Sequence, residues 1–197
     1  MRAPLFTSLV SLFLFFTCTN PDPRPANSPE SGIVVDSIEA EPPQYVIRQN
    51  RFYHLVAGEP LADAADRLER GTMNEGEGSY TVYDILGDDG ERIGFVVPSV
   101  TDSMLIGDIH VTTPTAATEG DIRVGHTFAR LRIAYPNVEV RASEIAGRTY
   151  AYTKNKAFRL ADFSFSQQQI DKEEVPAGTR ISEIIIMDQV RTAPLEI

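Results

Sequence analysis

The sequence predicts an α+β domain made of two similar units, each with one helix followed by three to four antiparallel strands. Hydrophobic residues make up 42% of the 197 residues and charged residues 23%, which is typical of globular proteins. Two segments have the apolar spacing of a helix, and each is followed by short segments with strand character. This repeated order indicates the α+β class and a possible internal duplication.

The first 17 residues have the features of an export signal. Met1–Pro4 carries one arginine, and an apolar run follows from Leu5 to Phe16. A helix of that length rises about 18 Å, too short to cross a hydrocarbon core of about 30 Å. A short positive start before such a run is typical of a signal peptide. We therefore expect residues 1–17 to be a signal peptide and the protein to be exported.

Cys18, the single cysteine, stands directly after this apolar run. The stretch Leu14–Cys18 resembles the lipobox of bacterial lipoproteins, although Phe15 and Thr17 depart from the residues that the family prefers. The resemblance implies that the Cys18 thiol receives a diacylglyceryl group and that Cys18 becomes the first mature residue. The protein would then be attached to a membrane of the cell envelope, the outer membrane facing the periplasm. The alternative is an ordinary signal peptide that contains a cysteine.

Residues 18–44 are predicted to be a lipidated, disordered tether. In this segment, prolines alternate with polar residues; the prolines are Pro21, Pro23, Pro25, Pro29, Pro42 and Pro43. Such a composition cannot bury enough apolar surface to fold. A proline-rich spacer extends about 3.1 Å per residue, so this one would reach several tens of ångströms. The alternative is a disordered tail without a role.

The first predicted unit covers residues 45–107. Its helix is expected at Pro60–Arg70, because proline suits the first helical position and Gly71 suits the stop. Leu61, Ala64 and Leu68 then share one apolar face. Asp88-Asp89-Gly90 is a hairpin signal between the first two of the expected strands, which are Ser79–Leu86, Arg92–Val97 and Leu105–Thr112. The segment between the helix and these strands is expected to be an acidic, flexible loop.

The second predicted unit covers residues 108–190, and residues 191–197 form a tail. Its helix is expected at Thr127–Tyr135, with Thr127 as the N-cap and Pro136 preventing continuation. Lys154-Asn155-Lys156 is expected to be a turn between the first two of the strands, which are Arg148–Thr153, Ala157–Ser166 and Arg180–Met187.

The two units can be aligned with small insertions. Gly58 and Gly125 each precede a predicted helix, and Ile106-Gly-Asp-Ile109 matches Ile181-Ser-Glu-Ile184. If the repeat is real, Ile109–Val111 joins the units into one continuous sheet or two adjacent sheets, with one face that needs cover or a partner. The alternative is one irregular α+β domain with a single antiparallel sheet.

The order of a glycine, a short helix and a strand meander resembles the tandem units of beta-lactamase inhibitory proteins. It also resembles small outer-membrane lipoproteins that accompany barrel assembly, and Gly120–Asn137 resembles a segment of uncharacterised exported bacterial proteins. These motifs encode a turn and a helix. The resemblance implies a binding or accessory role and carries over no active-site residue.

Composition excludes several kinds of chemistry. The net charge of -10 argues against nucleic acid as a partner, since phosphate binding needs clustered positive charge. A single cysteine excludes a disulfide framework, a cysteine-rich zinc site and a CxxC redox motif. The sequence contains neither a GxSxG nor a phosphate-binding glycine loop, and we expect no cofactor.

The histidines His54, His110 and His126 lack metal-ligand spacing. A metal site would need His110 and His126 to converge with Asp108 or Asp121. We instead expect His110 to face solvent and His126 to help cap the second helix, with no metal and no catalytic residue assigned.

One stretch, Arg148–Arg159, departs from the acidic background because it carries four basic residues and no acidic one. Strand alternation places Tyr150 and Tyr152 on one face. Aromatic and cationic side chains together can hold an anionic ligand, a sugar or an envelope protein. The candidate partner-binding residues are Arg148, Tyr150, Tyr152, Lys154, Lys156 and Arg159. The alternative is that the tyrosines belong to the core and the lysines only solubilise a turn.

These observations predict a lipid-anchored cell-envelope protein with a non-catalytic α+β domain that binds a ligand or a protein. Two alternatives remain open. One is an envelope hydrolase whose site is not visible as a motif, and the other is a proteinaceous enzyme inhibitor.

Overall fold

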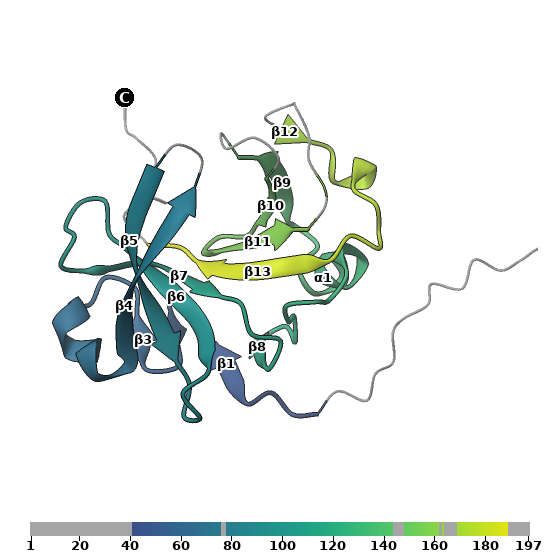
Figure 1. Ribbon diagram of the computed structural model, residues 1–197. Helices are drawn as coiled ribbons and strands as arrows, with labels where there is room; N and C mark the ends of the chain where they lie inside the picture. The colour runs from purple at the N-terminus through teal and green to yellow at the C-terminus, as the bar shows by residue number, and fades with distance from the viewer. Residues whose placement is uncertain (1–40, 76–77, 144–147, 162, 164–168, 189–197) are drawn as a thin grey trace, which may run out of the picture. The chain divides into compact units, whose positions relative to one another are not determined.

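The computed structural model describes residues 41–75, 78–143, 148–161, 163 and 169–188 (Figure 1). The predicted signal peptide, Cys18, most of the tether and the tail at 191–197 lie outside the described residues. The first strand, β1, begins at Tyr45, the residue at which the first unit is predicted to start. In the described part of the chain, no helix is long and apolar enough to cross a membrane.

The described residues form a main sheet of nine strands in which every neighbouring pair is antiparallel. Its order is β12-β9-β10-β11-β13-β7-β6-β5-β4. The strands are β4 (Leu68–Glu75), β5 (Gly78–Leu86), β6 (Arg92–Pro98), β7 (Ile106–Val111), β9 (Glu139–Ala142), β10 (Thr149–Tyr152), β11 (Lys156–Leu160), β12 (Gln169–Ile170) and β13 (Ile181–Ile186). Because β7 pairs with β13, the strands of both predicted units lie in one continuous sheet, which is one of the arrangements expected from the sequence. The antiparallel architecture with few helices fits the α+β class.

A second, smaller sheet was not expected from the sequence. It has the order β3-β2-β1-β8, with β1 (Tyr45–Ile47), β2 (Arg51–Phe52), β3 (Leu55–Val56) and β8 (Ala116–Thr118). Strand β1 pairs with β8 in parallel. Its strands have only two or three residues, too few to show a hydrophobic period.

One face of the main sheet carries the hydrophobic core. Ile109 and Val111 of β7 are fully buried, and they cluster with Phe52 and Leu55 of the small sheet and with Phe128 of the helix. Since side chains alternate along a strand, Asp108 and His110 of β7 point to the opposite face. That opposite face forms the site described below.

The second helix agrees closely with its prediction. Helix α1 spans Phe128–Ala134, with Phe128 and Leu131 buried. The Thr127 side chain caps it by accepting a hydrogen bond from the backbone N–H of Arg130 at 3.4 Å. A short 3-10 helix, η2 (Lys172–Glu174), follows β12.

The first helix is shorter than predicted. It is a 3-10 helix, η1 (Leu61–Arg67), and Leu68 already begins β4. Strand β4 pairs with β5 along eight residue pairs, from Leu68↔Ile85 to Glu75↔Gly78. These ladder hydrogen bonds outweigh the helical spacing, so Gly71 lies inside a strand, and the expected flexible loop is wrong for residues 71–75.

The start of each helix is held by the same arrangement of hydrogen bonds. Gly58 donates its N–H to the carbonyl of Ile106, and Gly125 donates to that of Ile181, each at 2.7 Å. Both glycines have a positive φ, 94° and 91°, which explains why glycine occupies each position. The start of η1 is therefore hydrogen-bonded to β7, and the start of α1 to β13; each is the last strand of its predicted unit.

Gly94 lies where β6 and β7 approach closely. A Cβ atom at this position would stand 2.2 Å from the carbonyl oxygen of His110. We expect Gly94→Ala to lower the free energy of unfolding by about 3 kcal/mol, measured by urea denaturation, because the backbone of β7 must move. Gly178→Ala is the control, since its Cβ would meet nothing within 4 Å, and it should change stability by less than about 1 kcal/mol. Equal stability of the two variants would contradict the close approach.

Candidate functional site

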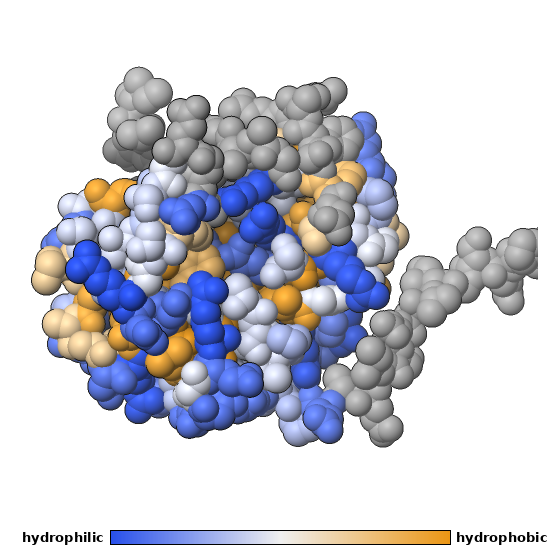
Figure 2. All heavy atoms as spheres, in the orientation of Figure 1, coloured by the Kyte–Doolittle hydropathy of each residue, from blue (hydrophilic) through white to orange (hydrophobic). Residues whose placement is uncertain are grey.

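The face of the main sheet opposite the core forms a groove of about 1770 Å³. Strand β7 contributes Asp108 and His110 at the positions that alternate with Ile109 and Val111, and Thr112 follows directly after the strand. Further residues come from β4, β5, β6, β10, β11 and β13, so the groove extends over both predicted units. Figure 2 shows hydrophilic and hydrophobic residues intermingled on the face of the molecule that it presents.

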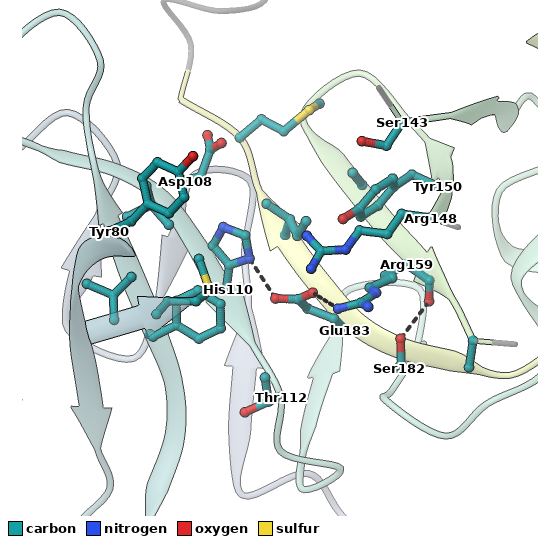
Figure 3. Close-up of a pocket in the computed structure, with 18 of the residues that line it drawn as sticks. Tyr80, Asp108, His110, Thr112, Ser143, Arg148, Tyr150, Arg159, Ser182 and Glu183 are labelled. Atoms are coloured by element: carbon teal, nitrogen blue, oxygen red, sulfur yellow. Dashed lines mark hydrogen bonds and ion pairs between the residues drawn. The ribbon is translucent and has the colours of Figure 1, made fainter. Parts of the chain in front are cut away.

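A carboxylate–imidazole pair lies at the centre of the groove. The Nδ1 of His110 lies 2.6 Å from Oε1 of Glu183, and Figure 3 shows this contact beside Arg159. Glu183 is 6% exposed, and its Oε2 lies 3.7 Å from the Arg159 guanidinium. The Phe95 ring stacks on the imidazole with centroids 4.4 Å apart and planes inclined by 14°. The imidazole is thus fixed by a hydrogen bond on its edge and an aromatic ring on its face.

These contacts continue across the sheet toward β5. The Arg92 guanidinium lies 5.1 Å from the centroid of the Phe95 ring, and its Nε lies 2.7 Å from Oδ1 of Asp84. Contacts therefore link side chains of β5, β6, β7, β13 and β11 in one series that includes the Phe95 ring. Such a connected series favours a single arrangement of the groove floor.

The two tyrosines of β10 lie in the groove. Tyr150 and Tyr152 share one face, as alternation predicts, with ring centroids 6.1 Å apart. Burial raises the pKa of the Tyr150 hydroxyl above its ordinary value of 10.0, and Glu183 adds to the rise, while Arg148 and Arg159 lower it. The Tyr150 hydroxyl is therefore neutral near pH 7 and can donate a hydrogen bond.

The structure separates the six candidate partner-binding residues into two groups. Arg148, Tyr150, Tyr152 and Arg159 line the groove. Lys154 is exposed in the turn, and neither Lys154 nor Lys156 lines the groove. The expectation that both lysines stand at an exposed hairpin tip is wrong for Lys156, which is only 4% exposed.

Lys156 is buried because β11 begins at this residue, one position earlier than predicted. It pairs with Ile186 and alternates with Ala157, which lines the groove. Burial lowers the pKa of Lys156 below its ordinary value of 10.5, and the charge of Glu119 opposes this shift only in part.

The histidines also differ from expectation. His110 was expected to face solvent, but its side chain is only 15% exposed. It lies in the groove on the face of the main sheet opposite the core, with Glu183 beside it. The Nδ1 of His126 accepts a hydrogen bond from the backbone N–H of Arg123 at 3.2 Å, and burial lowers its pKa. The described residues contain no group of three or more side chains that could hold a metal ion.

Sequence reasoning missed Phe95 and Glu183. One signal for Glu183 was present, since it is the single charged residue in the strand Ile181–Ile186, where alternation places it beside Ile185. A charged residue at an apolar position of a strand indicates a paired or functional group. Its partner His110 is 73 residues earlier, and only the pairing of β7 with β13 brings the two together.

Comparisons with known proteins leave the function open. No family model matches the chain, and no curated protein matches it. A solved structure, the uncharacterized protein yfeY from Escherichia coli, is similar with a TM-score of 0.47 and 14% identity. The match covers 72% of this chain and 98% of that chain.

The burial of Lys156 should lower the free energy of unfolding, and this effect can be measured. We expect Lys156→Met to raise the free energy of unfolding near pH 7, because the methionine needs no desolvation of a charge. In the unsubstituted protein, stability should rise with pH between the lowered pKa of Lys156 and 10.5, because the unfolded chain binds more protons there. In the Lys156→Met variant, this increase of stability with pH should be absent.

Two further variants complete this test by urea denaturation at several pH values. Lys156→Glu should destabilise the protein by about 3 kcal/mol or more, since it buries an unpaired carboxylate. Lys154→Met, in the exposed turn, is the matched control and should stay within about 0.5 kcal/mol. A harmless Lys156→Glu would show that this position is not buried.

Proposed function

We propose that the chain is a lipid-anchored cell-envelope protein whose groove binds a ligand or a protein without transforming it. The observation that carries this proposal is the groove itself, which the described residues form on the face of the main sheet opposite the packed core. A sheet normally buries both faces or keeps the outer one polar and flat. Here the groove face is concave, aromatic and charged.

The side chains of the groove are of the kinds that dominate binding interfaces. Tyrosine, phenylalanine, methionine and arginine are enriched at such surfaces and lysine is depleted. The groove is lined by Tyr80, Phe95, Tyr150, Tyr152, Phe163, Met73, Met187, Arg92, Arg148 and Arg159, and no lysine is among the described residues that line it. Ion pairs that already exist in the groove, such as Arg92 with Asp84, reduce the ordering that binding would require.

The anchor is supported by the sequence alone. The single cysteine follows the apolar run of the predicted signal peptide, and a proline-rich segment then leads to β1 at Tyr45. A tether of this length would let the groove reach partners several tens of ångströms from the membrane surface.

An envelope hydrolase is the second candidate function, and the pair of His110 and Glu183 favours it. A carboxylate that holds Nδ1 of an imidazole orients Nε2 as a general base. An activity that disappears in His110→Asn with the fold retained would favour this candidate over pure binding.

We also propose that the chain arose by duplication of a unit of one helix and three to four antiparallel strands. The support is the repeated hydrogen-bond arrangement at Gly58 and Gly125. A second pair of bonds agrees with it, from the N–H of Leu61 to Met104 and from that of Phe128 to Thr179. In each half a helix precedes the strands, and the last strands of the halves, β7 and β13, pair at the junction.

The lipid anchor predicts that Cys18→Ser releases the protein from membranes. The variant should be recovered in the soluble fraction and lose labelling by a fatty-acid probe, because the acceptor thiol is gone. Thr17→Ser is the matched control and should remain membrane-bound and labelled. Labelling of the Cys18→Ser chain would rule out this anchor.

The groove predicts where a partner touches the protein in cells. A photo-crosslinking residue, p-benzoylphenylalanine, at Tyr152 should give specific adducts detected by mass spectrometry. The same residue at Ile133, which is 71% exposed on helix α1 and does not line the groove, should not give them. Adducts at Ile133 but not at Tyr152 would place the binding surface elsewhere.

A further inference from the structure

We infer that strand β4 is an interface at which a second copy of this chain adds its own β4, antiparallel and with a two-fold axis at Gly71. The axis joins the two nine-stranded sheets edge to edge and places both grooves on the same side. The interface uses a strand edge, so it does not depend on whether the groove binds a ligand.

Strand β4 differs from the other terminal strands in the described part of the chain. It ends the main sheet and has eight residues, whereas β12, β3 and β8 end their sheets with two or three (Figure 1). Short edge strands, prolines, lysines and bulges prevent an edge from pairing with another chain. Strand β4 contains neither proline nor lysine, and its ladder with β5 runs through eight pairs without a register shift.

The outer edge of β4 therefore presents a regular row of backbone donors and acceptors. Among the described residues, no strand pairs with this edge. The side chains of Glu69, Arg70, Thr72 and Asn74 are exposed along it. A long and regular edge of this kind is a template for an added antiparallel strand.

The pairing with β5 shows which residues of β4 share the groove face. Opposite residues of an antiparallel pair point to the same face. Met73 lies opposite Tyr80, and both line the groove. Because side chains alternate, Gly71 shares this face with Met73. A two-fold axis at a residue sets each position opposite one of the same face, which keeps the two grooves on one side.

Charge selects the position of the axis. An axis at Arg70 would set the two arginines opposite each other, and like charges directly opposite are destabilising. An axis at Thr72 would set Glu69 opposite Glu75, which are both acidic. An axis at Gly71 sets no like charges directly opposite each other.

The axis at Gly71 makes β4 complementary to itself. Glu69 of each copy lies opposite Met73 of the other, and Arg70 lies opposite Thr72. Since Met73 lines the groove, each groove gains Glu69 of the partner copy at its rim. Glycine inside a strand often marks a place where another backbone approaches closely, and here the two copies of Gly71 meet without side chains.

The charge at residue 72 tests this interface. The full chain in detergent micelles should dimerise with a dissociation constant on the order of 10 µM, measured by density-matched sedimentation equilibrium. Thr72→Glu should lower this constant about fivefold and Thr72→Lys should raise it about fivefold, because residue 72 faces Arg70 of the partner copy twice in each dimer. The same two substitutions at Ser103, an exposed residue between β6 and β7, are the matched controls and should leave the constant unchanged.

Two results would overturn the interface. One is a chain that stays monomeric up to about 200 µM, which is also the result expected if the edge pairs with an extended segment of a different protein. The other is an equal change in the dissociation constant for Thr72→Glu and Thr72→Lys, which would place Arg70 of the partner copy elsewhere.

A cysteine at the axis tests the register directly. Residues opposite each other have Cα atoms about 5 Å apart, within the range of a disulfide, so Gly71→Cys should cross-link two copies on mild oxidation. Asn74→Cys is the control, because its two copies would stand about 20 Å apart. Mass spectrometry of the linked peptide distinguishes this bond from one through Cys18. Cross-linking at residue 74 but not at residue 71 would contradict the axis.

The two tests are independent of each other. A Cβ atom at Gly71 would stand 3.2 Å from Oδ2 of Asp84, so the cysteine requires a small shift of that carboxylate. If Gly71→Cys does not fold, the opposite effects of Thr72→Glu and Thr72→Lys still decide the question.

Discussion

The pairing of β7 with β13 is the interaction on which the rest of the structure depends. Its register sets Ile109 opposite Ile186 and Val111 opposite Ile184, which gives the core a fully buried centre. The same register places His110 and Glu183 together on the other face. A shift by one residue would exchange the two faces, burying the imidazole in the core and exposing the isoleucines. Core and groove are thus determined by one strand pair.

The burial of Glu183 adds a free-energy cost to this strand pairing. Removing a carboxylate from water costs several kcal/mol, which must be offset by close partners. His110 and Arg159 supply those partners, and Phe95 covers the imidazole face. Replacement of such a pair by apolar residues is often neutral or stabilising, so fold stability alone does not explain why a charge lies here. Glu183 lies beside Arg159 in the groove to which the proposed binding function is assigned.

The sequence predicted those elements whose residues carry a clear period. Strands β5, β6 and β7 and helix α1 lie within two residues of their expected ends. Strand β4 was missed because Leu68–Glu75 lacks alternation and contains Gly71, and its partner β5 holds it in place. The expected strand at Ala157–Ser166 begins one residue earlier, at Lys156, and its far end lies mostly outside the described residues.

Only the part of the candidate site that lies on the hairpin of β10 and β11 could be predicted from the sequence. Charge contrast indicated Arg148, Tyr150, Tyr152 and Arg159, which lie on β10, on β11 or directly beside β10, and all four line the groove. Charge contrast could not tell these arginines from Lys154 and Lys156, because composition carries no information about faces. A lysine solvates strongly and suits a turn, whereas a guanidinium stacks on rings and binds planar groups. Among the described residues, the groove is lined by arginine and not by lysine beside its tyrosines, and only the positions of the strands in the sheet show this selection.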